Sequence, residues 1–313
     1  MTETLLWYRM FVSRKGGPPW ESCRKASLPG LRTTDSAVRR PQVDLRRTNL
    51  MSVVAKVKFA DYETSVAKAL DLIKAAGRLP QTGLVIIKPN LTNADPPPVT
   101  TNVKAVEAVY NFCKSNSKAN IAIGEGCGEG ITIDTFKANG YTKLAEKFGI
   151  RLIDFNEEKA IVLKSKNTLQ LKQLYIPEIV KDAFIISLPV LKDHCFTATT
   201  IAMKNMFGIA PAPFYRGSWN KSKLHSPSTH KSVVDICLYK KPDLCLVDAS
   251  VALAGMHLSG ESIKLGLILA GFDAVAVDAV GSKLLGHNPK KIQYLTLANN
   301  VLGSLDNIKI LHG

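Results

Sequence analysis

The stretch LVIIKPNLTNADPPPVTTNVKAVEAVYNFCKSNSKANIAIGEGCGEG, residues 84–130, contains a complete strand–helix–strand unit. Leu84–Ile87 is wholly apolar, which predicts a short buried strand. Val103–Lys114 carries apolar side chains at helical spacing, and Ala119–Gly124 predicts a second strand that enters a glycine-rich loop. Wholly apolar strands are typical of parallel sheets that helices cover on both faces, so this unit predicts an α/β fold.

The same alternation continues through the rest of the chain from Met51. Further strands are predicted at Val53–Phe59, Ile150–Phe155, Asp182–Leu188, Leu244–Val247 and Lys264–Ala270, and further helices at Tyr62–Ala76, Asp134–Phe148, Ala198–Phe207, Ser232–Tyr239, Ala274–Leu285 and Lys290–Asn300. Two alternating runs, Ile161–Leu163 and Leu169–Ile176, predict an antiparallel hairpin. We therefore expect a mostly parallel, Rossmann-like sheet with helices on both faces and one short antiparallel hairpin. Residues 51–313 form a single α/β domain in this interpretation, and an arrangement of two lobes around a cleft stays open.

Residues 1–50 differ from this pattern and are predicted to be a disordered basic extension. They contain ten Lys and Arg residues against four acidic ones, and four prolines interrupt every apolar run. An organelle transit peptide and a nucleic-acid-binding arm remain alternatives. Another is a start codon called too far upstream, with Met51 as the true first residue.

The composition excludes several classes of protein. A chain with 46% hydrophobic and 21% charged residues can bury a large core, so it is not a disordered protein. No run of eighteen apolar residues is present, so we expect no membrane span. The six cysteines stand singly without a C-x-x-C pair, which argues against a zinc ribbon and an integral iron–sulphur cluster and favours the reducing cytoplasm. The net charge of +15 favours anionic partners without choosing among them.

In such sheets, ligands bind beyond the carboxyl ends of the strands, and the first loop there is residues 88–101. Lys88 and Asn90 leave a buried strand end together, where a ligand would meet them. Thr100 or Thr101 is expected to cap the following helix, whose N-terminus suits an anion. An ordinary proline-rich connection is the alternative.

The second loop, GEGCGEG at residues 124–130, alternates glycine with other residues. Gly124 and Gly126 would let backbone N–H groups approach an anion closely. The spacing matches neither the Rossmann fingerprint nor the Walker motif. Glu125 is expected to be a metal ligand, a general base or the partner of a lysine, and a glycine-rich turn without a ligand stays open.

The third segment, SLPVLKDHCFTATTIAMKNMFG at residues 187–208, is dense in cations and hydroxyl groups. His194 could be a metal ligand or an acid–base group, or a structural hydrogen-bond donor. Cys195 beside it suggests a Cys–His nucleophile, but adjacent residues usually point apart. The segment's candidate site residues are Lys192, His194, Thr199, Thr200, Lys204 and Asn205.

The later part of the chain offers candidate metal ligands. His230 precedes a predicted helix, and Asp248 follows the strand Leu244–Val247. With His194 they make a possible metal site. Asp278 lies on an apolar helix and therefore needs a partner inside the fold.

Together these segments resemble the domain of unknown function numbered 362. The resemblance runs from about Met51 to the end and depends on IIKPNL, PVTT, IGEG, LPVLKDH, KNMFG, VDAS, LAGMHLSG and FDAVAVDAVGSKLLG in that order. Some members of that family are fused to ferredoxin-type iron–sulphur modules, and this chain lacks their cysteine runs. The resemblance therefore implies a ferredoxin-type partner rather than an integral cluster.

KDHCFTATTIAMKN is also similar to a segment of lactate-racemase-type proteins that surrounds a nickel-pincer nucleotide. NADPPPVTT is similar to their DHTRP loop, although that motif itself is absent. The similarity implies that Lys192, His194 and Lys204 face the ligand, and that His230 is a metal-side histidine. A divalent metal or a metal–organic cofactor is thus one possible cofactor.

The interpretation we favour is an enzyme-like α/β protein that binds an anionic carboxylate or phosphorylated molecule. The expected catalytic groups are Lys192, His194, Lys204 and Glu125, and the expected ligand-binding residues are Lys88, Asn90, Thr100, Thr101, Gly124, Gly126, Thr199, Thr200 and Asn205. Two alternatives stay open. One is a non-catalytic accessory or electron-transfer partner of an iron–sulphur protein. The other is nucleic-acid binding through the basic arm, which we consider the weaker one because aromatics are few and no nucleic-acid motif is present.

Overall fold

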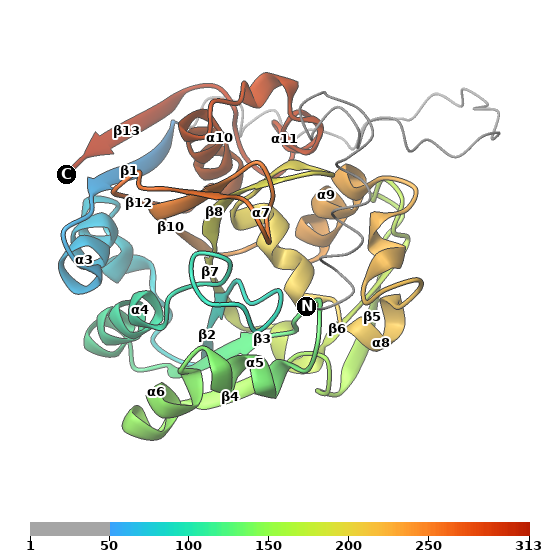
Figure 1. Cartoon of the computed structure of the whole chain (residues 1–313), viewed down its shortest axis with the longest axis horizontal. Coiled ribbons are helices and arrows are strands. Elements are labelled where there is room, and N and C mark those ends of the chain that lie inside the picture. Colours follow the sequence, from blue (N-terminus) through green and yellow to red (C-terminus); the bar gives the residue numbers. More distant parts are fainter. Residues whose placement is uncertain (1–50) are drawn as a thin grey trace. The chain divides into compact units, whose positions relative to one another are not determined.

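The computed structural model describes residues 51–313, and the extension predicted for residues 1–50 lies outside them. The described part contains a large mixed sheet with helices on both faces (Figure 1). The main strands run in the order β13 (Ile308–His312), β1 (Ser52–Lys58), β12 (Leu267–Gly271), β10 (Leu244–Ala254), β7 (Phe184–Leu188), β2 (Leu84–Pro89), β3 (Asn120–Glu125) and β4 (Arg151–Asp154). From β10 to β4 all neighbours are parallel, whereas β12 runs antiparallel to both β10 and β1. The expected mostly parallel α/β sheet is therefore confirmed.

Three short strands extend the sheet beside β10: β8 (Val190–His194), β9 (Ala198–Thr200) and β11 (Glu261–Ile263). A separate antiparallel hairpin joins β5 (Ala160–Lys164) and β6 (Gln173–Pro177), as the sequence predicted.

Alternate residues of the central strands point to opposite faces, and each face carries its own hydrophobic core. On one face Val85 and Ile87 pack with α3 (Tyr62–Leu72), α4 (Val103–Asn116) and α6 (Tyr141–Phe148). On the other, Ile86 and Ala122 pack with α7 (Ala202–Asn205), α9 (Thr229–Tyr239), α10 (Ala274–Leu284) and α11 (Gln293–Ala298). The remaining helices are α5 (Thr132–Ala138), α8 (Ala212–Tyr215) and the 3-10 turns η2 (Ala75–Arg78), η3 (Glu178–Val180), η4 (Met206–Ile209), η5 (Ser222–His225) and η6 (Pro289–Lys291). In the described part of the chain, no helix has the length and apolar content needed to cross a membrane.

One difference from the prediction shapes the site. The strand expected to end at Leu188 continues after Pro189 as β8, because β10 is eleven residues long and its second half provides a pairing edge. The helix expected over Ala198–Phe207 begins only at Ala202. Ala198–Thr200, which were predicted to begin this helix, form strand β9 instead and pair with β8. This agrees with the preference of β-branched threonines for strands.

Candidate functional site

A cavity of about 360 Å³ opens at the carboxyl ends of β2 and β3 and along β8. Nine of the residues singled out in the sequence line it together: Lys88, Asn90, Glu125, Gly126, Lys192, His194, Thr200, Lys204 and Asn205. A larger hollow of about 850 Å³ lies at the amino ends of β2 and β3 and contains none of them. The cluster of polar side chains therefore marks the smaller cavity as the candidate site.

Strand alternation selects which residues of β8 reach the cavity. Lys192 and His194 are two residues apart and share the face that lines it. Asp193 between them binds the His287 ring at 2.7 Å and the Gly255 N–H at 2.6 Å. In β9, Thr200 lies opposite Lys192 and also lines the cavity.

The floor of the cavity is a buried ion pair. The Lys88 Nζ donates to Glu125 Oε2 at 2.8 Å and to Asn205 Oδ1 at 3.1 Å. Glu125 also accepts from the N–H groups of Leu91 and Gly126 at 3.2 and 2.9 Å. A Cβ atom at Gly208 would overlap both Glu125 and Lys88, so glycine is required there for the pair to form.

Two further lysines are held by backbone carbonyl groups. The Lys192 Nζ donates to Val99 O at 2.7 Å, and the Lys221 Nζ donates to Gly126 O at 2.5 Å and more weakly to Phe207 O and Gly208 O. Burial lowers the pKa of Lys192 to about 7. Burial, together with the charge of Lys88, lowers the pKa of Lys221 to about 8. Lys221 was not predicted as a site residue, because nothing in the sequence of its loop shows that the loop folds back onto the glycine-rich turn.

Lys204 differs from the other three lysines. Its Nζ lies 3.7 Å from the centre of the Phe207 ring and makes no hydrogen bond to a described residue. Burial, together with the charges of Lys221 and Lys192, lowers its pKa to about 7. The ring contact favours the ammonium form by about 1–2 kcal/mol, less than the roughly 5 kcal/mol that corresponds to the lowered pKa. Lys204 is therefore partly neutral near pH 7.

The cavity has an excess of positive charge and several polar atoms without partners. Four lysines and two glutamates, Glu125 and Glu129, line it, so the net charge is +2 when all six are ionised (4 − 2). Asn90 Oδ1, Thr200 Oγ1 and His257 Nδ1 are buried and have no hydrogen-bond partner among the described residues. Buried polar atoms are normally satisfied, so these three atoms indicate a place for a polar ligand.

The mouth of the cavity is aromatic. His225 packs against Phe196, Phe207 and Trp219 with ring centres 5.5–6.0 Å apart. Phe196 and Trp219 are about half exposed. Burial and nearby Lys204 lower the pKa of His225 to about 4, so this ring is neutral at physiological pH.

Four predicted ligand-binding residues lie outside the cavity lining and support it instead. Thr101 Oγ1 accepts from the Asn90 N–H and donates to Leu188 O, which joins the ends of β2 and β7. Thr100 binds Asp95 and Asn139, and the N-cap of α4 is Asn102 rather than either threonine. Thr199 points away from Thr200 and bonds to Tyr294. A Cβ atom at Gly124 would overlap the Phe155 ring, so this glycine serves packing.

The metal site predicted from His194, His230 and Asp248 does not form. The His230 ring accepts the Tyr294 N–H at 3.2 Å and stacks on the Tyr294 ring. Asp248 accepts from the Tyr62 hydroxyl at 2.8 Å and from Ser250. His230 on α9 and Asp248 on β10 thus belong to separate hydrogen-bond networks and do not join His194 in a metal-binding group.

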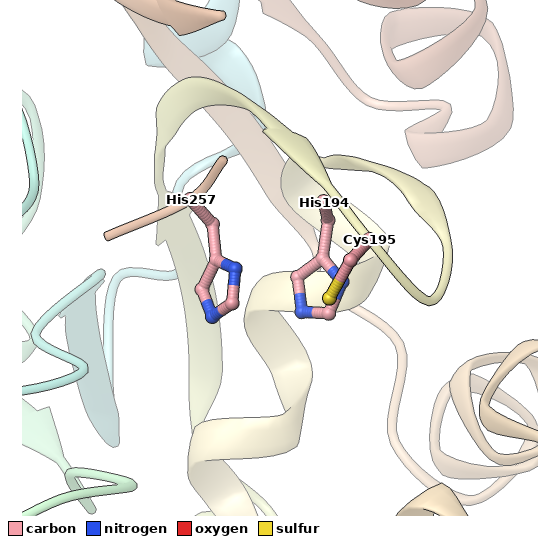
Figure 2. Close-up of side chains that lie close together, drawn as sticks. All are labelled: His194, Cys195 and His257. Atoms are coloured by element: carbon pink, nitrogen blue, oxygen red, sulfur yellow. The ribbon is translucent and has the colours of Figure 1, made fainter. Parts of the chain in front are cut away.

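The histidine beside His194 is instead His257, which the sequence analysis did not single out. Possible ligand atoms of His194, Cys195 and His257 lie within 4.8 Å of one another (Figure 2). The two imidazole rings are stacked, with centres 4.2 Å apart and planes inclined by 17°. A metal ion binds imidazole nitrogen in the plane of the ring, and nearly parallel, stacked planes do not share such a point. As arranged, the two imidazole rings do not coordinate one metal ion together.

Asp278 holds the helix that carries Lys204 and Asn205. Its carboxylate accepts from the N–H groups of Ala202 and Met203 at 2.8 and 3.2 Å and from the Tyr294 hydroxyl at 3.0 Å. The sequence predicted that Asp278 needs a partner inside the fold, and that partner is the start of α7.

Raising the pH from 7 to 9 is expected to stabilise the protein through Lys192 and Lys204. Their pKa values of about 7 in the folded state lie below the ordinary 10.5, so in this range the unfolded chain binds more protons. Each lysine then contributes up to about 1.4 kcal/mol per pH unit. Denaturant unfolding at pH 7, 8 and 9 measures this slope. Lys204→Met should be more stable than the wild type at pH 7 and have a shallower slope, and equal slopes would contradict the prediction.

Comparisons with known proteins agree with the motifs. Residues 85–283 match the family described as Domain of unknown function (DUF362), which confirms the family resemblance. The thylakoid-associated protein sll1697 of Synechocystis sp. is similar to this chain, with 26% identity over 214 residues. The aligned region is 66% of this chain and 64% of that relative, so the chain spans less than two thirds of the relative's length.

Proposed function

Because the chain belongs to the DUF362 family, whose description names no activity, we propose a function from the cavity itself. The protein binds a small carboxylate or phosphorylated molecule there and acts on it as an enzyme, by proton transfer.

One observation carries this proposal: four buried lysines converge on a cavity with only two carboxylates among its described lining. Burying like charges together is unfavourable unless an opposite charge enters. Burial lowers the pKa of all four lysines, and neighbouring lysines add to this for Lys204 and Lys221. A bound anion offsets it, and Asn90 and Thr200 add polar contacts from the same walls.

The proton-transfer groups follow from the hydrogen bonds. His194 Nδ1 accepts the Phe196 N–H at 3.1 Å, so the proton of the neutral ring is on Nε2. Burial, with Lys204 and His257 nearby, holds the His194 pKa well below its ordinary 6.5. Neutral His194 therefore acts as a hydrogen-bond donor to a negatively charged oxygen, and Lys192 and Lys204, with pKa values of about 7, exchange protons with the bound molecule.

Phosphate or citrate is expected to raise the melting temperature at pH 6.5, and more weakly at pH 9. Binding favours charged lysines, so affinity falls as the pH rises through their pKa values of about 7 to 8. At an anion concentration of 100 Kd the stabilisation is about 2.7 kcal/mol. Thermal unfolding with increasing anion concentration provides the measurement.

Lys204→Met should weaken this protection, whereas Lys223→Met, with an exposed lysine in the same region, should keep it. If Lys204→Met is protected to the wild-type extent, the shared anion site is wrong.

Two alternatives remain. An accessory role beside a ferredoxin-type partner predicts that Lys192→Ala keeps biological activity and loses the partner. Nucleic-acid binding through residues 1–50 predicts that deleting this segment abolishes DNA binding.

We also propose a cytoplasmic location, since no disulfide joins cysteines within residues 51–313. Finding the thiols blocked as disulfides in the purified protein would contradict it.

A further inference from the structure

The four lysines of the cavity are not equivalent. Lys88 is held by Glu125, Lys192 by the Val99 carbonyl and Lys221 by three carbonyl groups. Each of these three amino groups is thereby held in position by its acceptors. Lys204 is nine-tenths buried yet has no hydrogen bond to a described residue, and its Nζ faces the Phe207 ring at the cavity wall.

We propose that Lys204 is a covalent nucleophile that forms a Schiff base with a carbonyl compound bearing a carboxylate or phosphate group. The proposal rests on the proposed function, since the other three lysines would hold the anionic group of the same molecule. A buried lysine without a hydrogen-bonded partner, beside other cationic side chains, is in an environment where an amine becomes nucleophilic. Its pKa of about 7 agrees with this role.

The chemistry balances without an oxidant or a reductant. The lone pair of neutral Nζ forms a bond to the carbonyl carbon, and the carbonyl π pair moves to oxygen. A proton passes from nitrogen to that oxygen and gives a carbinolamine. A second proton then makes the hydroxyl group leave as water, while the nitrogen lone pair forms the C=N bond. His194 lines the same cavity, and its Nε2–H is placed to donate to the carbonyl oxygen.

The aromatic mouth suits this class of ligand. His225, Phe207 and Trp219 surround the entrance beside Lys204 and keep water from the carbon–nitrogen bond once a ligand is bound. The apolar part of the carbonyl compound would lie against them, and its anionic end against Lys192 and Lys221.

The test is reductive trapping on the full-length protein at pH 7. Pyruvate in one arm and dihydroxyacetone phosphate in the other are incubated with the protein and cyanoborohydride, and modified lysines are mapped by peptide mass spectrometry. Lys204 should be modified roughly a thousandfold faster than exposed Lys223 by at least one probe, because about half of Lys204 is neutral at pH 7, against less than about one in a thousand for an ordinary lysine. Which probe reacts distinguishes a carboxylate ligand from a phosphorylated one. Modification spread evenly over exposed lysines, with Lys204 not preferred by either probe, would overturn the proposal.

The two proposals fail separately. Phosphate protection of the wild type without trapping at Lys204 would reject the Schiff base and leave anion binding intact. Absence of phosphate and citrate protection would reject the anion site itself. Lys204→Arg keeps the charge and should retain part of the phosphate protection while losing the trapped product. The peptide map of the wild type decides the matter even if that variant folds poorly.

Discussion

Glu125→Ala is expected to destabilise the protein by about 3–5 kcal/mol, the largest effect of any substitution considered. Lys88 is fully buried, and its 2.8 Å contact with Glu125 is its ion pair. Burial lowers the pKa of Lys88, and Glu125 opposes that shift. Without the carboxylate, the protein must bury an unpaired ammonium group or bind one proton fewer. The N–H groups of Leu91 and Gly126 also lose their acceptor.

Urea unfolding of Glu125→Ala measures the effect, and two comparisons identify its cause. Adding Lys88→Met should recover much of the loss, since the ammonium group that lost its partner is then removed as well. Glu107→Ala removes the partner of Lys147 in an exposed ion pair and should cost less than about 1 kcal/mol. A cost for Glu125→Ala no larger than that of Glu107→Ala would show that the floor of the cavity is not held by this pair.

Asp278→Ala is expected to destabilise the protein by about 2–4 kcal/mol and to weaken anion protection at the same time. The substitution leaves two buried N–H groups at the start of α7 and the Tyr294 hydroxyl without their acceptor. Because α7 carries Lys204 and Asn205, a local shift there moves both side chains in the cavity. Asp278→Asn keeps one acceptor oxygen and should fall between wild type and alanine. Asp134→Ala, at an exposed aspartate of α5, is the matched control.

Asp278→Ala is also expected to change how the stability of the protein depends on pH below neutrality. Burial raises the pKa of Asp278 from 3.8 to about 7, so between these values the folded state binds more protons than the unfolded chain. This group therefore makes the protein less stable as the pH rises from 4 to 7, by up to about 1.4 kcal/mol per unit. Asp278→Ala should remove that contribution. Unchanged anion protection in a folded Asp278→Ala protein would separate Asp278 from the cavity.

The predicted ends of strands were the sequence feature that best located the candidate site. Lys88 and Glu125 end two apolar strands, and parallel strands bring such ends together, so their meeting follows from local pattern alone. Lys192 and His194 also reach the cavity, but from a strand where a loop was expected. That strand depends on the length of β10, more than fifty residues further along the chain, so no local pattern predicts it.

Residue type did not indicate which threonine or histidine faces the cavity. Thr199 and Thr200 differ only in the side of β9 to which they point, and a shift of one residue in the pairing with β8 would exchange them. His257 and Lys221 come from loops with no periodicity, so only the folded chain brings them to the site. His230, in contrast, was predicted as a metal ligand from the sequence, but its ring accepts the Tyr294 N–H and lies outside the cavity.

The sequence by itself determined the fold class, the family and the edge of the sheet where polar side chains gather. These three features follow from short-range periodicity and from motifs, both of which depend on residues close together in the chain. Only the tertiary structure decided which four lysines share a cavity, which one of them lacks a hydrogen-bonded partner, and that His194 stacks on His257 rather than joining a metal site. Those outcomes depend on pairing register, loop paths and burial. Each arises from contacts between residues far apart in the chain. Burial, together with the charges of nearby lysines, makes Lys204 partly neutral near pH 7.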